Sequence, residues 1–241
     1  MNLYRVYPTP GALDVSSDDG PAQLEQWFQP DHSPIVRWAV VATPRGSVHD
    51  EQGTSSGLSN PVDRAILRTL RSQADAVITA ASTVRAEAVP VPDTAVLVIL
   101  SRTGDLDGHR VSPHSLRPGG ITIITGPQPT AAPESFFPPG VATHEVVGDG
   151  DQLNPVSIVD HLRRRGMSSL LLEAGSQLAG AFLDQQLIDE CILSLTGSPR
   201  SESHPPLPWW SDNWGEWSAS AVFTDDARYL YTRYHRPPLA A

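Results

Sequence analysis

Two turns in this sequence place charged or hydroxyl side chains directly after apolar runs. Residues 98–104 read VILSRTG, so a serine hydroxyl and a guanidinium follow a run typical of a buried strand. Arginine binds a phosphomonoester through two charge-assisted hydrogen bonds, and serine adds another donor. Ser101 and Arg102 are therefore a candidate phosphate site, although the sequence Ser-Arg-Thr-Gly at residues 101–104 also suits an ordinary turn.

Residues 170–180, LLLEAGSQLAG, form the second such turn. Glu173 ends the predicted strand, and Ser176 lies where the N-cap of a following helix is expected. The backbone N–H groups of Gly175, Ser176 and Gln177 could then face an anion, because the amino end of a helix carries free N–H groups. A capped helix without a ligand remains the alternative.

Two weaker turns follow the same pattern. Residues 76–89, AVITAASTVRAEAV, offer Thr83 and its neighbouring amides to a diphosphate, but small side chains replace the glycines usual in such turns. In ITIITGP the hydroxyl of Thr125 takes the same place after a strand. One turn of this kind means little, whereas four at one sheet edge suggest a site for an extended nucleotide.

The elements that must position these turns alternate between strands and helices. Asn-Pro pairs at residues 60–61 and 154–155 predict helix starts, since Asn caps a helix and Pro suits its first turn. The predicted strands are 35–42, 76–79, 95–100, 121–125, 169–172 and 190–195, followed by an antiparallel pair at 217–223 and 229–235. This order indicates an α/β sheet, mostly parallel, whose ligand lies at the carboxyl ends of the parallel strands.

Composition narrows the function. The chain has 241 residues and a net charge of −10, which argues against binding nucleic acid or an anionic membrane surface. Its 17 basic residues are all arginine, which excludes a Schiff-base lysine and the lysine of a P-loop. Cys191 stands alone, so neither an internal disulfide nor a cysteine zinc site is expected, and no metal site is predicted. Without a long apolar segment or a signal pattern, a cytoplasmic protein is expected.

Taken in order, five segments of the chain point to one family. They are SSGLSNPVDRAILRTLRSQADAV, STVRAE, SRTGDLD, LLLEAGSQLAGAFLDQQLIDE and RYLYTRYHR. From about residue 36 to 235 the chain resembles the dihydrofolate reductase-like superfamily, and more closely the stand-alone form of the C-terminal pyrimidine reductase domain of riboflavin biosynthesis. The resemblance implies a three-layer α/β sandwich over residues 35–241, preceded by an N-terminal extension at 1–34.

The resemblance also implies an activity, which is NADPH-dependent reduction of a ribosylamino-pyrimidine type of substrate. Ser101 and Arg102 would contact the adenosine 2′-phosphate, and the other turns would hold the nicotinamide and the diphosphate. The remaining candidate cofactor-binding residues, with Thr125 taken from the strand pattern, are Ser82, Thr83, Val84, Thr125, Glu173, Ala174, Gly175, Ser176 and Leu178.

On the substrate side, Glu87 matches an acidic family position and is the candidate general acid. Ser55 lies in the loop that usually covers substrate, and Arg64 and Arg71 are candidates for holding a substrate phosphate. Each of these side chains could instead be an ordinary solvated residue. The nucleotide-like substrate is the expected small-molecule partner, and the family's usual state predicts a homodimer built through C-terminal strands.

Several positions depart from the family pattern. Alanine or serine replaces glycine at Ala80, Ser82 and Ala174, and Arg45 stands where a carboxylate is usual. Adding a side chain costs about 1 kcal/mol or more wherever the glycine needs a positive φ or close ligand contact. The alternative is therefore a non-catalytic or repurposed relative with weakened or absent NADPH binding, acting as a ligand- or partner-binding protein.

Overall fold

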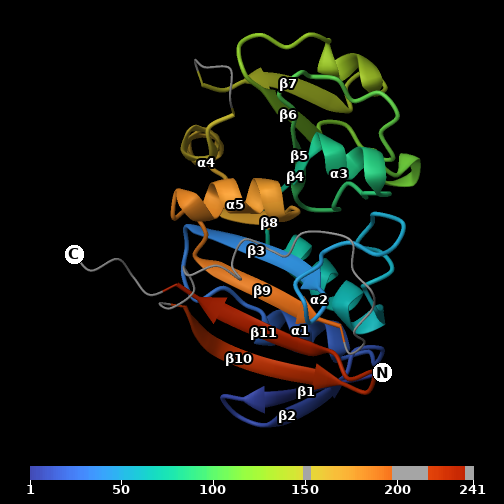
Figure 1. Ribbon diagram of the computed structural model, residues 1–241, viewed down its shortest axis with the longest axis vertical. Helices are drawn as coiled ribbons and strands as arrows, with labels where there is room; N and C mark the ends of the chain where they lie inside the picture. The colour runs from blue at the N-terminus through green and yellow to red at the C-terminus, as the bar shows by residue number, and fades with distance from the viewer. Residues whose placement is uncertain (149–152, 197–216, 237–241) are drawn as a thin grey trace, which may run out of the picture.

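The computed structural model describes residues 1–148, 153–196 and 217–236. Within them the strands form one sheet in the order β2-β1-β10-β11-β9-β3-β8-β4-β5-β6-β7 (Figure 1). The strands are β1 (Asn2–Tyr7), β2 (Gly11–Asp14), β3 (Ile35–Ala42), β4 (Ala76–Ala80), β5 (Val96–Leu100), β6 (Ile121–Thr125), β7 (Ala142–Val146), β8 (Ser169–Glu173), β9 (Glu190–Leu195), β10 (Ser218–Asp225) and β11 (Leu230–His235). The helices are α1 (Gly20–Trp27), α2 (Pro61–Ser72), α3 (Ala81–Ala86), α4 (Pro155–Arg164) and α5 (Ser176–Asp184), with short 3-10 turns η1 (Pro113–Ser115) and η2 (Pro133–Phe136).

The sheet has a parallel part and an antiparallel part. Strands β9, β3, β8, β4, β5, β6 and β7 pair in parallel, whereas β2, β1, β10, β11 and β9 pair antiparallel. This confirms the predicted α/β class with a mostly parallel centre and antiparallel C-terminal strands. All the predicted strands are present within one or two residues of their expected bounds.

Side chains alternate between two apolar cores, one on each face of the sheet. In β4 and β5, Val77 and Leu97 pack on the side of α1, α2 and α3, whereas Ile78 and Val98 pack on the side of α4 and α5. Strands covered on both faces read as continuous apolar runs, which is why these segments were identifiable from sequence. The result is the predicted three-layer sandwich (Figure 1).

The two predicted Asn caps start their helices. The Asn60 side-chain oxygen accepts a hydrogen bond from the Asp63 N–H at 2.9 Å, and that of Asn154 accepts one from the Val156 N–H at 2.9 Å. Each satisfies an N–H that the first helical turn leaves free. Helix α2 packs Val62, Ile66 and Leu70 into the apolar core on this face of the sheet. The Tyr231 hydroxyl of β11 donates a hydrogen bond to Asn60 at 3.1 Å, so the start of α2 lies beside β11.

The first 34 residues are more structured than their sequence pattern indicates. Strand β1 pairs with β10, and β2 closes that edge of the sheet. These two strands lie at one end of the sheet and bury few side chains: in β1 only Leu3 is fully buried, and Tyr7 is exposed. The alternation that identifies a strand is therefore weak here.

A buried charge cluster ties this segment to the sheet. The Glu190 carboxylate, which has no exposed surface, accepts hydrogen bonds from the Arg37 Nε and, at 2.6 Å, from the Arg233 Nε. The same guanidinium groups donate to the carbonyl oxygens of Phe28, at 2.7 Å, and Trp27, at 2.9 Å. The end of α1 is thus held against β3 and β11 by charge-assisted hydrogen bonds.

Candidate functional site

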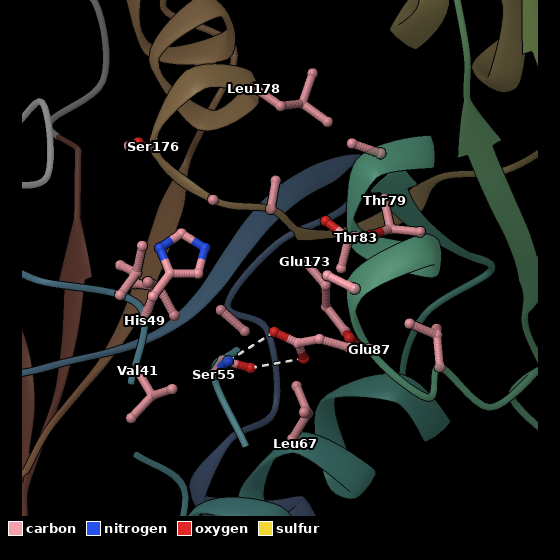
Figure 2. A pocket seen from close by; sticks show the side chains of 18 of the residues that line it. Val41, His49, Ser55, Leu67, Thr79, Thr83, Glu87, Glu173, Ser176 and Leu178 are labelled. Carbon is pink, nitrogen blue, oxygen red and sulfur yellow. Dashed lines mark hydrogen bonds between the residues drawn. The ribbon is translucent and has the colours of Figure 1, made fainter. Parts of the chain in front are cut away.

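A cavity of about 670 Å³ opens at the carboxyl ends of β3, β4, β8 and β9. It lies between α2 and α3 on one side and the start of α5 on the other, and Figure 2 shows side chains from these elements around it. Cavities of roughly 300–1,000 Å³ are typical of small-molecule sites. The position is the one expected for an α/β sheet, in the crevice beyond the strand ends.

The amino end of α5 opens onto this cavity. Gly175 is the N-cap residue, and no side chain caps the helix, so Ser176 is the first helical residue rather than the cap that its sequence suggests. A Cβ added at Gly175 would have only the His49 ring within reach, at 4.0 Å. Gly175, Ser176 and Leu178 all line the cavity, so uncapped backbone N–H groups lie beside an open space of ligand size.

Glu173 and Arg71 meet across the cavity wall. The guanidinium of Arg71 donates to both carboxylate oxygens of Glu173, at 2.7 and 2.6 Å. Burial lowers the pKa of the Arg71 guanidinium. The negative charge of Glu173 and its hydrogen bonds raise that pKa by a larger amount, so the net shift is upward. The predicted cofactor residue and the predicted substrate residue therefore hold each other in place, and both line the cavity.

The loop between β3 and α2 brings Ser55 to Glu87. The Glu87 carboxylate accepts from the Ser55 N–H at 2.6 Å and from its hydroxyl at 2.9 Å, as the dashed lines in Figure 2 show. Asp50 shapes this loop by accepting from the N–H groups of Thr54, at 2.9 Å, and Gly57, at 3.0 Å. A Cβ on Gly57 would lie 2.4 Å from Asp50, so this close approach requires glycine.

The turn after β4 has ordinary backbone geometry despite its missing glycines. Ala80 has φ −94° and ψ 152°, which any L-residue adopts. In the described part of the chain, the non-glycine residues with positive φ are Gln186 and Arg228, so neither Ser82 nor Ala174 is strained in this way. Ser82 and Thr83 line the cavity together with Ala174, whereas the Val84 side chain is fully buried in the core.

Besides Val84, four predicted site residues lie outside the cavity lining. The Ser101 hydroxyl accepts from the Gly104 N–H at 3.0 Å, and Arg102 beside it is exposed. The Thr125 hydroxyl donates to the Gly126 carbonyl at 2.8 Å, and exposed Arg64 donates to the Ser59 carbonyl at 3.3 Å.

The strand order still places the phosphate candidates at one edge. Ala80 pairs with Leu100, and Ile78 pairs with Leu172, so the turns after β5 and β8 flank the end of β4. Neighbouring strands lie about 4.8 Å apart, which puts the chain at Ser101 roughly 10 Å from the end of β8. This distance is within the length of a dinucleotide.

The cavity also contains polar residues that the sequence analysis did not single out. Asp63, Ser59, Thr79 and Ser194 line it, and the Thr79 hydroxyl is buried with no hydrogen-bond partner in the described residues. Burial raises the pKa of the Asp63 carboxyl, although hydrogen bonds from Ser194 and Ser59 oppose that shift. The sequence signal that could have identified this part of the site is Asp63 itself, an acidic residue beside Val62 on the otherwise apolar face of α2.

Sequence comparison gives one family match. Residues 34–196 match the model of the RibD C-terminal domain. No curated protein sequence matches the chain.

Solved structures with the same fold include several reductases. A pyrimidine reductase-like protein from Corynebacterium diphtheriae is 18% identical, covers 89% of this chain and 99% of its own, and has a TM-score of 0.69. Riboflavin biosynthesis reductase Rib7 of Saccharomyces cerevisiae is 12% identical over 91% of this chain and 100% of its own, with a TM-score of 0.67.

A longer relative has the same core. The deaminase/5-amino-6-(5-phosphoribosylamino)uracil reductase of Thermotoga maritima is 22% identical, with a TM-score of 0.66, over 84% of this chain and 56% of its own. This chain therefore spans just over half of that protein. At these identities the likeness is one of fold, and it agrees with the predicted α/β sandwich with a mostly parallel central sheet.

The described residues contain no cluster of three or more His, Cys, Asp or Glu side chains arranged to hold a metal ion. Nor does any helix in these ranges have the length and apolar character needed to cross a membrane.

Proposed function

The chain belongs to the RibD C-terminal domain family, and on that premise we propose that it is an NADPH-dependent reductase of a ribosylamino-pyrimidine type of substrate. The observation that carries the proposal is the uncapped amino end of α5, which opens onto the cavity at the ends of the parallel strands. Backbone N–H groups in this arrangement bind the diphosphate of a dinucleotide.

The residues present fit such a cofactor. Gly175 leaves open the space that a side chain would fill, and Ser82 and Thr83 line the opposite wall of the cavity. Arg102 is exposed at the same sheet edge, where its guanidinium is available to an adenosine 2′-phosphate. The buried side chain of Val84 leaves its backbone for any contact with the nicotinamide region.

NADPH, when bound, supplies the hydride, and the resemblance places its acceptor at the ribose C1 of the substrate. The chain's own residues bind and orient the substrate and supply a proton. Glu87 lines the cavity and is the proposed acid, with Ser55 holding its carboxyl in one orientation. Arg71 presents a guanidinium whose orientation is fixed by Glu173, and Arg64 lies at the start of the same helix.

The alternative is a repurposed, non-catalytic relative. No observation at the described positions that depart from the family pattern favours it. Ala80 has an ordinary backbone conformation, and Ala174 is not among the positive-φ residues. Arg45 is exposed and does not line the cavity. The expected homodimer and cytoplasmic location stay predictions.

A titration with NADPH and NADH tests the proposal. The wild-type protein is expected to bind NADPH, with quenching or enhancement of cofactor fluorescence. The variant R102Q should lose roughly 10–100-fold in NADPH affinity, the value of a charge-assisted hydrogen bond, and little in NADH affinity. R163Q, which removes an exposed arginine from α4, is the matched control. No binding at millimolar cofactor would refute the proposal.

A further inference from the structure

His49 lines the cavity, but the roles proposed above assign nothing to it. It lies in the loop between β3 and α2, and Gly175, Ser176 and Gln177 line the same cavity at the start of α5. A Cβ placed on Gly175 would lie 4.0 Å from the Cε1 atom of the His49 ring. Figure 2 shows the ring on the side of the cavity where Ser176 lies. An imidazole is therefore positioned beside the uncapped amino end of a helix.

The backbone on either side of His49 is held in place. Val48 is buried in the apolar core on the α4 and α5 side of the sheet. The Ser47 hydroxyl donates a hydrogen bond to the His49 carbonyl at 3.0 Å. On the other side, the Asp50 N–H donates one to the Thr54 carbonyl at 2.7 Å. These contacts fix where the His49 side chain leaves the backbone, at the wall of the cavity that faces α5.

Negative charge exceeds positive charge around this cavity. Carboxylates line it at Asp63, Glu87 and Glu173. One guanidinium, that of Arg71, belongs to the described lining, and it donates to both carboxylate oxygens of Glu173. Among the lining residues that the structure describes, His49 is the only other side chain able to carry a positive charge.

A dinucleotide brings further negative charge into this cavity. Its diphosphate stays ionised throughout the neutral pH range, and the carboxylates of the lining repel it. The backbone N–H groups at the start of α5 attract an anion, but a helix N-terminus is equivalent to only about half an elementary charge. The first turn of α5 carries no acidic side chain that would oppose the anion. A protonated imidazole beside the same N–H groups adds a full charge and a hydrogen-bond donor.

The remaining charged groups near the ring are accounted for. Burial raises the pKa of Asp50, but hydrogen bonds from Thr54 and other loop residues outweigh it and lower the pKa overall, so this charge is constant near neutral pH. Arg45, in the same loop, is exposed and does not line the cavity. Burial raises the pKa of the Asp63 carboxyl on α2. A variant of His49 keeps Asp63, so comparison with it assigns any pH dependence to the imidazole.

We propose that His49 is a cofactor-binding residue, whose protonated ring donates a hydrogen bond to the diphosphate held at the start of α5. The inference rests on the proposed function, because that function supplies the dinucleotide. It adds a dependence on pH, since histidine changes its charge between about pH 5 and 8. The anion favours the charged ring, so affinity is highest when the ring is protonated and falls as the pH rises through this range.

ADP-ribose isolates the contact with the diphosphate. It lacks the nicotinamide, and it lacks the 2′-phosphate, a group that itself titrates near about pH 6. Calorimetric titration of the wild-type protein at pH 6 and at pH 8.5 should show an affinity weaker by roughly tenfold or more at the higher pH, the value of a charge-assisted hydrogen bond. An affinity that does not change with pH would overturn the inference without any variant being needed.

Variants assign the effect to one side chain. H49Q keeps a polar side chain but does not titrate, so at pH 6 it should bind ADP-ribose roughly tenfold more weakly than the wild-type protein and show no pH dependence. H49R stays charged and should bind more tightly than H49Q at pH 8.5. H114Q, which alters an exposed histidine on η1, is the matched control and should behave like the wild-type protein. If H49Q keeps the wild-type pH profile, His49 does not contact the diphosphate.

NADPH titration of the same proteins at pH 8.5 separates this inference from the proposed function. Wild-type binding of NADPH, with a pH profile for ADP-ribose that H49Q leaves unchanged, would refute the role of His49 and leave the reductase proposal in place. Binding of ADP-ribose that depends on His49, with no tighter binding of NADPH, would refute the reductase proposal and support the anion contact. If ADP-ribose binds too weakly to measure, wild type and H49Q are compared with NADPH, because its 2′-phosphate is common to both titrations. Binding of neither ligand would overturn both proposals.

Discussion

Replacing Glu190 with Gln should destabilise the protein strongly. The Glu190 carboxylate has no exposed surface and lies between two guanidinium groups, those of Arg37 and Arg233. His235 contacts it as well, at 3.1 Å. Removing one charge from a buried ion-pair cluster costs about 3–5 kcal/mol, because the remaining charges stay buried without compensation. For a chain of this size, that corresponds to a fall in Tm of roughly 6–20 °C.

The same carboxylate predicts how stability depends on pH. Burial alone would raise the pKa of Glu190, but the hydrogen bond from His235 and the charges of Arg37 and Arg233 outweigh it and lower the pKa from 4.5 to about 2. A lowered folded-state pKa stabilises the protein above the unfolded-state value. That stability, about 3 kcal/mol, is lost as the pH falls from 4.5 toward 2.

Urea unfolding at pH 7 and at pH 3 measures both effects. The wild-type protein should lose more unfolding free energy between these pH values than E190Q does, because the variant lacks the titrating group. E25Q, which alters an exposed glutamate on α1, is the matched control and should behave like the wild-type protein. A loss below about 1 kcal/mol for E190Q at pH 7 would refute the reasoning, since buried pairs cost more to break.

Three further predictions concern the cavity wall and the start of α2. A double-mutant cycle of R71M and E173Q should give a coupling of about 1–2 kcal/mol in urea unfolding, because the bidentate pair is only partly screened, and additive effects would contradict it. G175L should lower NADPH affinity at least roughly tenfold with little change in Tm, since its side chain fills open cavity space; unchanged affinity would count against the groove. N60A should cost about 1–2 kcal/mol through the lost cap, and a smaller loss measured by thermal melting would show that α2 does not depend on it.

Much of the fold was predictable from local sequence. Asn60 and Asn154 identify helix starts because their side chains satisfy nearby N–H groups, which is a property of adjacent residues. Strands buried on both faces, such as residues 96–100, reveal themselves as apolar runs. Strands β1, β2 and β7 lie at the two ends of the sheet order, with mixed burial, and their pairing depends on partners distant in the chain.

The site was predictable in its position more than in its contacts. The carboxyl ends of parallel strands lie at one edge of the sheet, so the sequence predicts that the turns containing Ser82 and Gly175 lie close together. Both residues line the cavity. The pairing of Arg71 with Glu173 joins residues 102 positions apart, and no local pattern encodes it. The sequence identifies Asp63 only as a residue of a helix start. Its burial beside Ser194 depends on how α2 packs against β9.

A crystal structure determined after soaking with NADPH tests the central claim most directly. The account predicts electron density for the diphosphate against the backbone N–H groups of Gly175, Ser176 and Gln177. It also predicts the adenosine 2′-phosphate beside Arg102, with the nicotinamide reaching toward Thr83. Density at another surface, or an unchanged cavity at millimolar cofactor, would contradict it.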